Sequence, residues 1–342
     1  MTDKFVCVRI QSMNGVNINQ FQFEYDLTWM AFFQNAAGRT YTRYGGREDH
    51  HAESHLTQAS LVRVMRQVLQ LHRKQQVQPE NRYEPVAARN RTPEDIPPMK
   101  RMLARRKESK CIHCHDVKNA TLRHARHLGK LRKDMIYTYP SPSNIGLHLA
   151  SDKQNVVKRV TTDSPAAAAG VRPGDIVLSA AGQRILTFGD MTRVLELTPD
   201  KAELSMQIQR GDKVFATALP LTKGWRKNRD VAWRSSVEVV GPNAGFWGAK
   251  ANARRRRQLG LGKEDLALRV TFIWGKWTRQ AGIKIGDVVV AIDGKRTDMN
   301  VRQLHSRLQL HRDWGDTVPI VVRRGGKRLQ LKLRLPSVPA DP

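Results

Sequence analysis

A pair of matching segments, 112 residues apart, constrains the fold of this chain more than any other feature of its sequence. Residues 166–185 (AAAAGVRPGDIVLSAAGQRI) align with residues 278–297 (TRQAGIKIGDVVVAIDGKRT), and an Ala-Gly pair, a Gly-Asp pair and a later glycine recur at the same places. Each copy continues with a helix-like segment and then with two strand-like segments that flank a basic turn. The repeat therefore predicts two small antiparallel β structures, each with one capping helix.

The glycines of the repeat have a mechanical role. In the first copy, Gly170 and Gly174 bracket a tight turn after a one-turn helix, and Asp175 begins the next strand. This pattern, followed by apolar residues and a turn glycine, resembles the PDZ domains of bacterial HtrA-type proteases. The resemblance implies that backbone N–H groups of a loop receive the C-terminal carboxylate of a peptide, which adds as a strand beside the helix. In the first copy, the implied peptide-binding residues are Ile145, Gly146, Leu147, Leu149, Met191, Val194 and Leu195.

The second copy has a less regular loop, for which the candidates are Gly245, Phe246, Trp247 and Gly248. A long basic segment, residues 253–270, follows it, so the sequence favours peptide binding by the first copy. No protease signature accompanies the repeats, because the chain has no Gly-x-Ser-x-Gly and no convincing Ser, His and Asp set. We therefore predict no catalytic residues and expect that the chain is not an enzyme.

The first seventy or so residues predict part of an α/β unit. Residues 4–10 (KFVCVRI) alternate as a strand, which would bury Cys7 as an inert core thiol. A strand, a turn at Asn35 to Gly38 and a second strand follow, and residues 60–72 place apolar side chains on one helical face. That face consists of Leu61, Val64, Met65, Val68, Leu69 and His72. The order of elements is that of the second half of a thioredoxin-like fold.

The pentapeptide CIHCH contains two of the three cysteines. Its spacing is that at which Cys111 and Cys114 would bond to haem vinyl groups and His115 would ligate the iron as a c-type haem. Met135, His124 and His127 are candidates for a sixth ligand. Zinc is an alternative cofactor, bound by both thiols, His113 or His115, and His124 or His127. A thioredoxin-type dithiol is a third interpretation.

Several unrelated motifs occur in one fixed series over nearly all of the chain: FQFEYDLTWMAFFQNAAGRTYTRYGGRED, KCIHCHDV, YPSPSNIGL, GWRKNRDVAWR and the two repeats. This series resembles a bacterial family that joins a thioredoxin-like domain, a CxxCH connector and two PDZ domains, and that includes selenoproteins. The family carries a redox Cys-x-x-Cys or selenocysteine site ahead of the strand that matches residues 4–10. This chain begins just before that strand, so we expect a truncated start, with a signal peptide further upstream.

Composition narrows the classes of partner. The formal net charge is +28, but aromatic residues make up only 6% of the 342 residues, so nucleic acid is not favoured as a partner despite the high pI. Three cysteines give no disulfide framework, and no stretch approaches the roughly 20 apolar residues of a membrane span. The chain as given has no signal peptide, which would make it cytoplasmic if complete; thioether attachment of haem would place it in the periplasm or cell envelope.

The predicted fold class is therefore an α+β multidomain chain: a partial thioredoxin-like unit followed by two PDZ-like β domains. The expected boundaries are 1–74 for the thioredoxin-like part, 75–140 for the connector, 141–223 and 241–337 for the PDZ-like domains, and 224–240 for their linker. The predicted function is a scaffold in the cell envelope that binds peptide or protein C-termini, with a c-type haem and a redox partner. The alternative is a purely non-catalytic PDZ interaction protein with a zinc or remnant CxxCH site.

Overall fold

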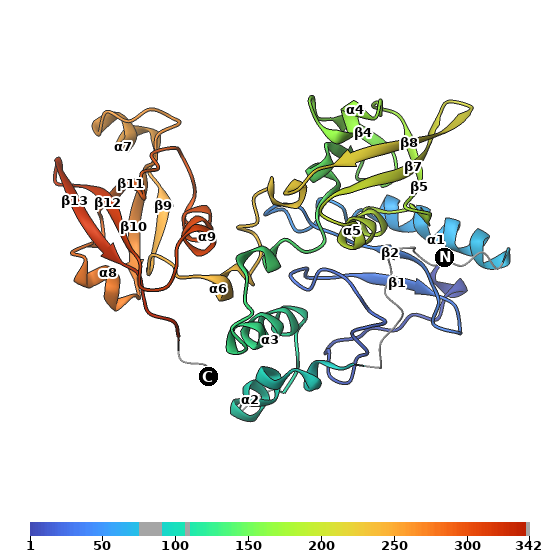
Figure 1. Cartoon of the computed structure of the whole chain (residues 1–342), viewed down its shortest axis with the longest axis horizontal. Helices are drawn as coiled ribbons and strands as arrows, with labels where there is room; N and C mark the ends of the chain where they lie inside the picture. Colours follow the sequence, from blue (N-terminus) through green and yellow to red (C-terminus); the bar gives the residue numbers. More distant parts are fainter. Residues whose placement is uncertain (75–90, 107–109, 340–342) are drawn as a thin grey trace. The chain divides into compact units, whose positions relative to one another are not determined.

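The computed structural model describes residues 1–74, 91–106 and 110–339, and the chain divides into two compact units (Figure 1). The first unit comprises residues 1–121 and 137–229, and the second comprises residues 122–136 and 230–342. Each unit is described by itself. No helix in the described ranges is both long and apolar enough to cross a membrane.

The first unit begins with a hairpin and a helix. Strands β1 (Ala31–Gln34) and β2 (Thr40–Tyr44) pair antiparallel, and the backbone N–H of Asn35 donates to the carbonyl of Arg39 to close their turn. Helix α1 (Gln58–Arg73) starts with a reciprocal capping box between Thr57 and Ser60 and packs on the hairpin. The predicted hairpin and helix are thus confirmed.

The predicted strand at residues 4–10 is wrong. A single 3₁₀ turn (Thr2–Lys4) precedes a segment without secondary structure, in which Val6 is 96% and Val8 80% exposed and Cys7 is exposed rather than buried. An alternating pattern forms a strand only when a neighbouring strand accepts its hydrogen bonds, and the sheet of this region contains β1 and β2 alone among the described residues. A thioredoxin-like unit is therefore not confirmed.

The connector holds a small core of its own. Helices α2 (Pro97–Arg105) and α3 (Cys114–His127) follow a 3₁₀ turn (Pro93–Asp95). Ile96, Met99 and Ile112 are fully buried, and the buried Met13 packs in the same cluster. The polar composition of the connector predicts little packing of its own. Residues 75–90 and 107–109 of the predicted connector lie outside the described residues.

The first repeat forms two sheets around α5. A 3₁₀ turn (Pro142–Ile145) leads into β3 (Leu147–Leu149), which pairs with β4 (Val157–Val160). The second sheet has the order β6-β5-β7-β8. Its strands and the helices of this repeat are α4 (Pro165–Ala168), β5 (Ile176–Ala180), β6 (Gln183–Arg184), α5 (Phe188–Leu197), β7 (Ala202–Arg210) and β8 (Lys213–Leu221).

The second repeat is one five-stranded antiparallel sheet in the order β13-β12-β11-β10-β9, with α9 packed on its apolar face. Two further 3₁₀ turns lie at Trp225–Lys227 and Lys133–Ile136. The elements of this part are α6 (Val237–Val240), β9 (Phe246–Lys250), α7 (Ala253–Gln258), β10 (Leu268–Ile273), α8 (Lys276–Gln280), β11 (Val288–Ile292), α9 (Val301–His311), β12 (Thr317–Arg324) and β13 (Lys327–Arg334).

The repeated Gly-Asp pair is explained by an ion pair that occurs in both copies. Asp175 is 1% exposed and accepts two hydrogen bonds from the guanidinium of Arg210, at 2.7 and 2.8 Å. Asp287 is bound in the same way by Arg324, at 2.7 and 2.8 Å. Each aspartate thus connects the turn that contains its glycine to the basic hairpin at the end of its repeat. Both contacts are bidentate, a geometry that the guanidinium group of arginine provides and the ammonium group of lysine does not.

Candidate functional site

The loop ahead of β3 has the geometry that the first repeat predicts. Gly146 follows the 3₁₀ turn with φ of 85°, and a Cβ on it would lie 2.0 Å from the Ser164 hydroxyl oxygen, so only glycine fits. The structure brings the predicted loop, strand and helix positions into one region, and their apolar side chains share one core cluster. These residues are Ile145, Gly146, Leu147, Leu149, Met191, Val194 and Leu195.

The side chains that line this region of the first repeat are buried. Leu149 is the most exposed of the apolar groove side chains, at 6%, and all residues of α5 from Phe188 to Leu195 are buried. Strand β3 pairs only with β4 among the described strands, so its other edge, like that of β9, faces no strand. The first repeat therefore has the parts of a peptide groove, and its apolar groove side chains are buried.

The N-terminal hairpin covers the other side of α5 within the same unit (Figure 1). The Thr42 hydroxyl donates to the Asp190 carboxylate at 2.6 Å, and the backbone N–H of Arg43 donates to the same carboxylate at 3.0 Å. The Thr187 hydroxyl donates in return to the carbonyl of Arg43. Burial raises the pKa of Asp190, while these donors oppose the rise. Strand β2 and the helix are thus joined by hydrogen bonds as well as by packing.

The loop itself is held by Glu48. Its carboxylate accepts hydrogen bonds from the hydroxyls of Ser141 (2.5 Å) and Ser143 (2.9 Å) and lies 3.4 Å from His55 Nε2. Burial raises the pKa of Glu48, but the hydrogen bonds of His55, Ser141 and Ser143 outweigh it and lower the pKa from 4.5 to about 2. Arg229 also donates to the Ser143 hydroxyl, at 3.0 Å. The segment after β2 and the segment after β8 together fix this loop.

The second repeat presents an equivalent loop with a different surrounding. Gly245 has φ of 70°, and a Cβ on it would lie 2.4 Å from Thr278 Oγ1 and 2.6 Å from the Trp277 ring. Strand β9 follows directly and pairs only with β10 among the described strands, so its other edge faces no strand. Helix α9 contacts β9. An edge strand next to a helix is the arrangement to which an extended peptide adds.

An aromatic cluster lies between β9 and α9. The His305 ring on α9 lies 6.0 Å from that of Phe246, 6.2 Å from Trp247 and 5.8 Å from Trp274. Trp247 and Trp274 are each 40% exposed, and the Arg302 guanidinium lies 5.4 Å from the Trp247 ring centre. Large aromatic side chains are thus half open to solvent at this groove, in contrast to the first repeat.

His305 carries an unsatisfied polar atom. It is only 8% exposed, and its Nε2 has no hydrogen-bond partner in the part of the chain that the structure describes. Burial lowers its pKa to about 4, so the ring is neutral at pH 7. Sequence reasoning missed His305 and Trp274, although Asn243-Ala244-Gly245-Phe246 matches Asn144-Ile145-Gly146-Leu147 and identifies the second loop.

The CxxCH residues lie at the start of α3. Cys111 is exposed and precedes the helix, and Cys114 is its partly buried first residue, whose pKa burial raises. His115 is half exposed, and its ring stacks on that of His113 at 5.5 Å. Cys111 and His115 are thus accessible to solvent, whereas Cys114 is only partly so. Ile112, however, is fully buried in the connector core, so a haem here would be largely exposed.

The candidates for a further ligand lie beyond this turn. His124 and His127 are on α3, and His124 Nδ1 is buried without a partner among the described residues. Met135 packs in a cluster with Leu122 and residues 239–240, all in the second unit. Over residues 1–74, 91–106 and 110–339, no three His, Cys, Asp or Glu side chains are grouped to hold a metal ion. The zinc and haem predictions stay predictions.

Comparison with known proteins finds two PDZ domains in this chain, at residues 156–210 and 277–335. The chain is 38% identical over 65 residues to a putative zinc metalloprotease of Mesorhizobium japonicum, which is 19% of this chain and 18% of that protein. It is 47% identical over 55 residues to a serine protease Do-like HtrA of Lactobacillus helveticus, which is 16% of this chain and 13% of that protein. The chain thus spans less than a fifth of the length of these curated relatives.

Among solved structures, the HtrA-type protease AlgW with a decapeptide matches with 19% identity and a TM-score of 0.25. The match covers 43% of this chain and 52% of that one.

Proposed function

We propose that the chain is a protein-interaction scaffold and that its second PDZ domain binds the C-terminal segment of a partner protein. The observation that carries this proposal is the groove between β9 and α9, where an open strand edge, half-exposed tryptophans and the unpaired Nε2 of His305 lie together. Buried polar atoms without partners are rare in folded proteins, and a ligand is one way to satisfy them.

In this proposal, backbone N–H groups around Gly245 receive the terminal carboxylate and the edge of β9 pairs with the peptide backbone. The neutral ring of His305 would exchange a hydrogen bond with a polar group of the peptide. Trp247 and Trp274 would cover its apolar side chains. The charge of +28 favours partners whose C-terminal region is acidic.

The first PDZ domain has a different part in the proposal. Its helix α5 is joined to β2 by hydrogen bonds, so in this proposal the first PDZ domain holds the N-terminal hairpin within its own unit.

Fluorescence anisotropy with labelled peptides from a library of C-terminal sequences tests the proposal on the full chain. We expect peptides with a free carboxylate to bind and the same peptides with a C-terminal amide to bind at least tenfold more weakly, about 1.4 kcal/mol. Trp274→Ala should weaken binding, whereas Trp29→Ala, which removes a tryptophan of similar exposure (46%) from the N-terminal region, should not. Equal binding of acid and amide peptides would refute the groove.

We also propose covalent haem at Cys111 and Cys114 with His115 as axial ligand, because both Cys111 and His115 are accessible in the structure. A bound haem would supply one-electron chemistry, imply an electron-transfer partner and place the chain in the cell envelope. The test is a pyridine haemochrome spectrum of chain exported in a host that matures c-type cytochromes, beside Cys111→Ala/Cys114→Ala. A c-type band absent from the variant supports haem; no band after proven export leaves peptide binding as the function, with zinc or no cofactor at the cysteines.

A further inference from the structure

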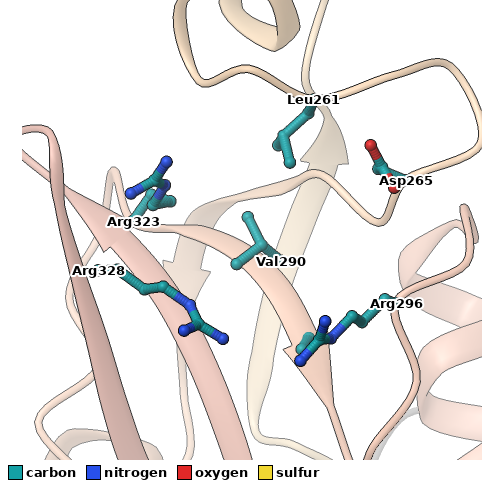
Figure 2. A pocket seen from close by; sticks show the side chains of 7 residues that line it. Leu261, Asp265, Val290, Arg296, Arg323 and Arg328 are labelled. Atoms are coloured by element: carbon teal, nitrogen blue, oxygen red, sulfur yellow. The ribbon is translucent and has the colours of Figure 1, made fainter.

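A cavity of about 340 Å³ opens on the second PDZ domain, away from its peptide groove. Its lining includes the side chains of Arg296, Arg323, Arg328, Leu261, Val290 and Asp265 (Figure 2). Val289 of β11 points into the core that holds α9, whereas Val288 and Val290 pack with Leu261. Since side chains alternate along a strand, the cavity lies on the sheet face opposite to α9.

The three arginines give this cavity an excess of positive charge. Arg296 and Arg328 are exposed and form no ion pair among the described residues, and Figure 2 shows them extending toward one another near Val290. Among the described residues, the guanidinium of Arg323 is bound only by carbonyl oxygens, those of Leu259 (3.3 Å) and Gly326 (3.5 Å). By contrast, the adjacent Arg324 is neutralised by Asp287.

The single carboxylate in the lining does not cancel this charge. Asp265 Oδ2 accepts a hydrogen bond from the backbone N–H of Gly262 at 2.6 Å, so the carboxylate is engaged with its own loop. Three guanidinium groups against one carboxylate leave a site that attracts anions.

The wall of the cavity is held rigidly by another arginine. Arg256 donates to the carbonyls of Gly262 (2.8 Å) and Asp265 (2.6 Å) and to the Asp298 carboxylate (2.6 Å), and its side chain is only 12% exposed. The wall is a feature of the second domain alone, because 37 residues separate Gly245 from Gly282, whereas 24 separate Gly146 from Gly170. An anchored loop positions the site before any ligand arrives.

We propose that this cavity is an anion-binding site for a phosphate group, held by the guanidinium groups of Arg296, Arg323 and Arg328 over the apolar floor of Val290 and Leu261. The planar guanidinium fork matches phosphate oxygens in a bidentate manner. The phosphate belongs either to a small soluble ester or to a lipid headgroup, and both present the same oxygens.

Isothermal titration of the full chain with inorganic pyrophosphate, at about 0.15 M salt to screen the diffuse charge, tests the site. We expect binding by the wild type and a loss on the order of tenfold or more in Arg296→Ala/Arg328→Ala. The matched control is Lys276→Ala/Lys284→Ala, which removes two exposed positive charges from the same domain outside the cavity. It should bind like the wild type. Arg296→Lys/Arg328→Lys keeps the charge and should still bind more weakly, because the fork is lost.

A second arm identifies the source of the phosphate. Sedimentation with phosphatidylcholine vesicles that contain phosphatidic acid, against phosphatidylcholine alone, measures binding to a headgroup monoester. A specific loss in the cavity variant indicates a lipid headgroup, whereas pyrophosphate binding with equal vesicle binding by cavity and control variants indicates a soluble ester. No pyrophosphate binding by the wild type, or equal losses in the cavity and control variants, would overturn the proposal.

Discussion

Glu48 offers a quantitative test of how the loop around Gly146 is held. Its carboxylate accepts hydrogen bonds from Ser141 and Ser143 and faces His55, and the substitution Glu48→Gln removes the charge while keeping the shape. Because the side chain is only 26% exposed, solvent screens these bonds weakly.

The magnitude follows from the pKa of Glu48. A carboxyl whose pKa is lowered from 4.5 to about 2 on folding stabilises the folded state by at most about 3 kcal/mol at neutral pH. Because the folded pKa is depressed, this stabilisation is fully present above pH 4.5 and is lost as the pH falls from 4.5 toward 2. The loss should approach about 1.4 kcal/mol for each pH unit within that window.

Urea unfolding of the wild type and Glu48→Gln at neutral pH, and again at several values between pH 4.5 and 3, measures this contribution. We expect the difference in unfolding free energy to shrink steadily as the pH falls. Glu53→Gln, which removes an exposed carboxylate from the same segment, should differ from the wild type by no more than about 0.5 kcal/mol. A Glu48→Gln effect that is independent of pH would refute the assigned hydrogen bonds.

Three further predictions test other parts of the structure. Thr42→Val should lower the unfolding free energy of the first unit by about 1.5–3 kcal/mol, because it removes a hydrogen bond to the buried Asp190 carboxylate; a double-mutant cycle with Asp190→Asn that shows no coupling would contradict this. In calorimetry, Asp175→Asn should lower the melting transition of the first unit alone and Asp287→Asn that of the second alone, since each aspartate is paired within its own unit; a shift of both transitions by either change would argue against two units. Burial lowers the pKa of His305 from 6.5 to about 4, so the unfolding free energy of the second unit should fall as the pH drops from 6.5 to 4. His305→Gln should remove this pH-dependent loss of stability. A His305 ring that titrates near 6.5 by NMR would disprove its burial.

The internal repeat and its resemblance to PDZ domains were sufficient to predict both PDZ domains. The glycines of the Ala-Gly and Gly-Asp pairs encode turns, and this requirement depends on neighbouring residues only. The aspartates in addition bind Arg210 and Arg324, which lie 35 and 37 residues further along the chain. The same locality explains why the β1–β2 hairpin and the α1 helix were predictable. The alternation of residues 4–10 gave a wrong strand prediction for the opposite reason. A strand needs a hydrogen-bonding partner, and its own sequence does not specify one.

The state of each groove depends on distant contacts and could not be predicted. Thr42 and Asp190 are 148 residues apart, and nothing in either local sequence indicates that β2 covers α5. The sequence favoured the first groove because the loop around Gly245 is less regular and a long basic segment follows it. His305 looks like an ordinary helical residue until the fold surrounds it with Phe246, Trp247 and Trp274.

The most direct test of the central claim is an NMR map of a free-carboxylate peptide, selected from the C-terminal library, on the isotopically labelled full chain. The account predicts that the largest changes in backbone amide shifts fall on Gly245, on β9 and on α9 around His305, and that the corresponding region of β3 and α5 stays unchanged. Shifts confined to Gly146 and β3, or none in either domain, would contradict the proposal that the second PDZ domain is the open peptide-binding site.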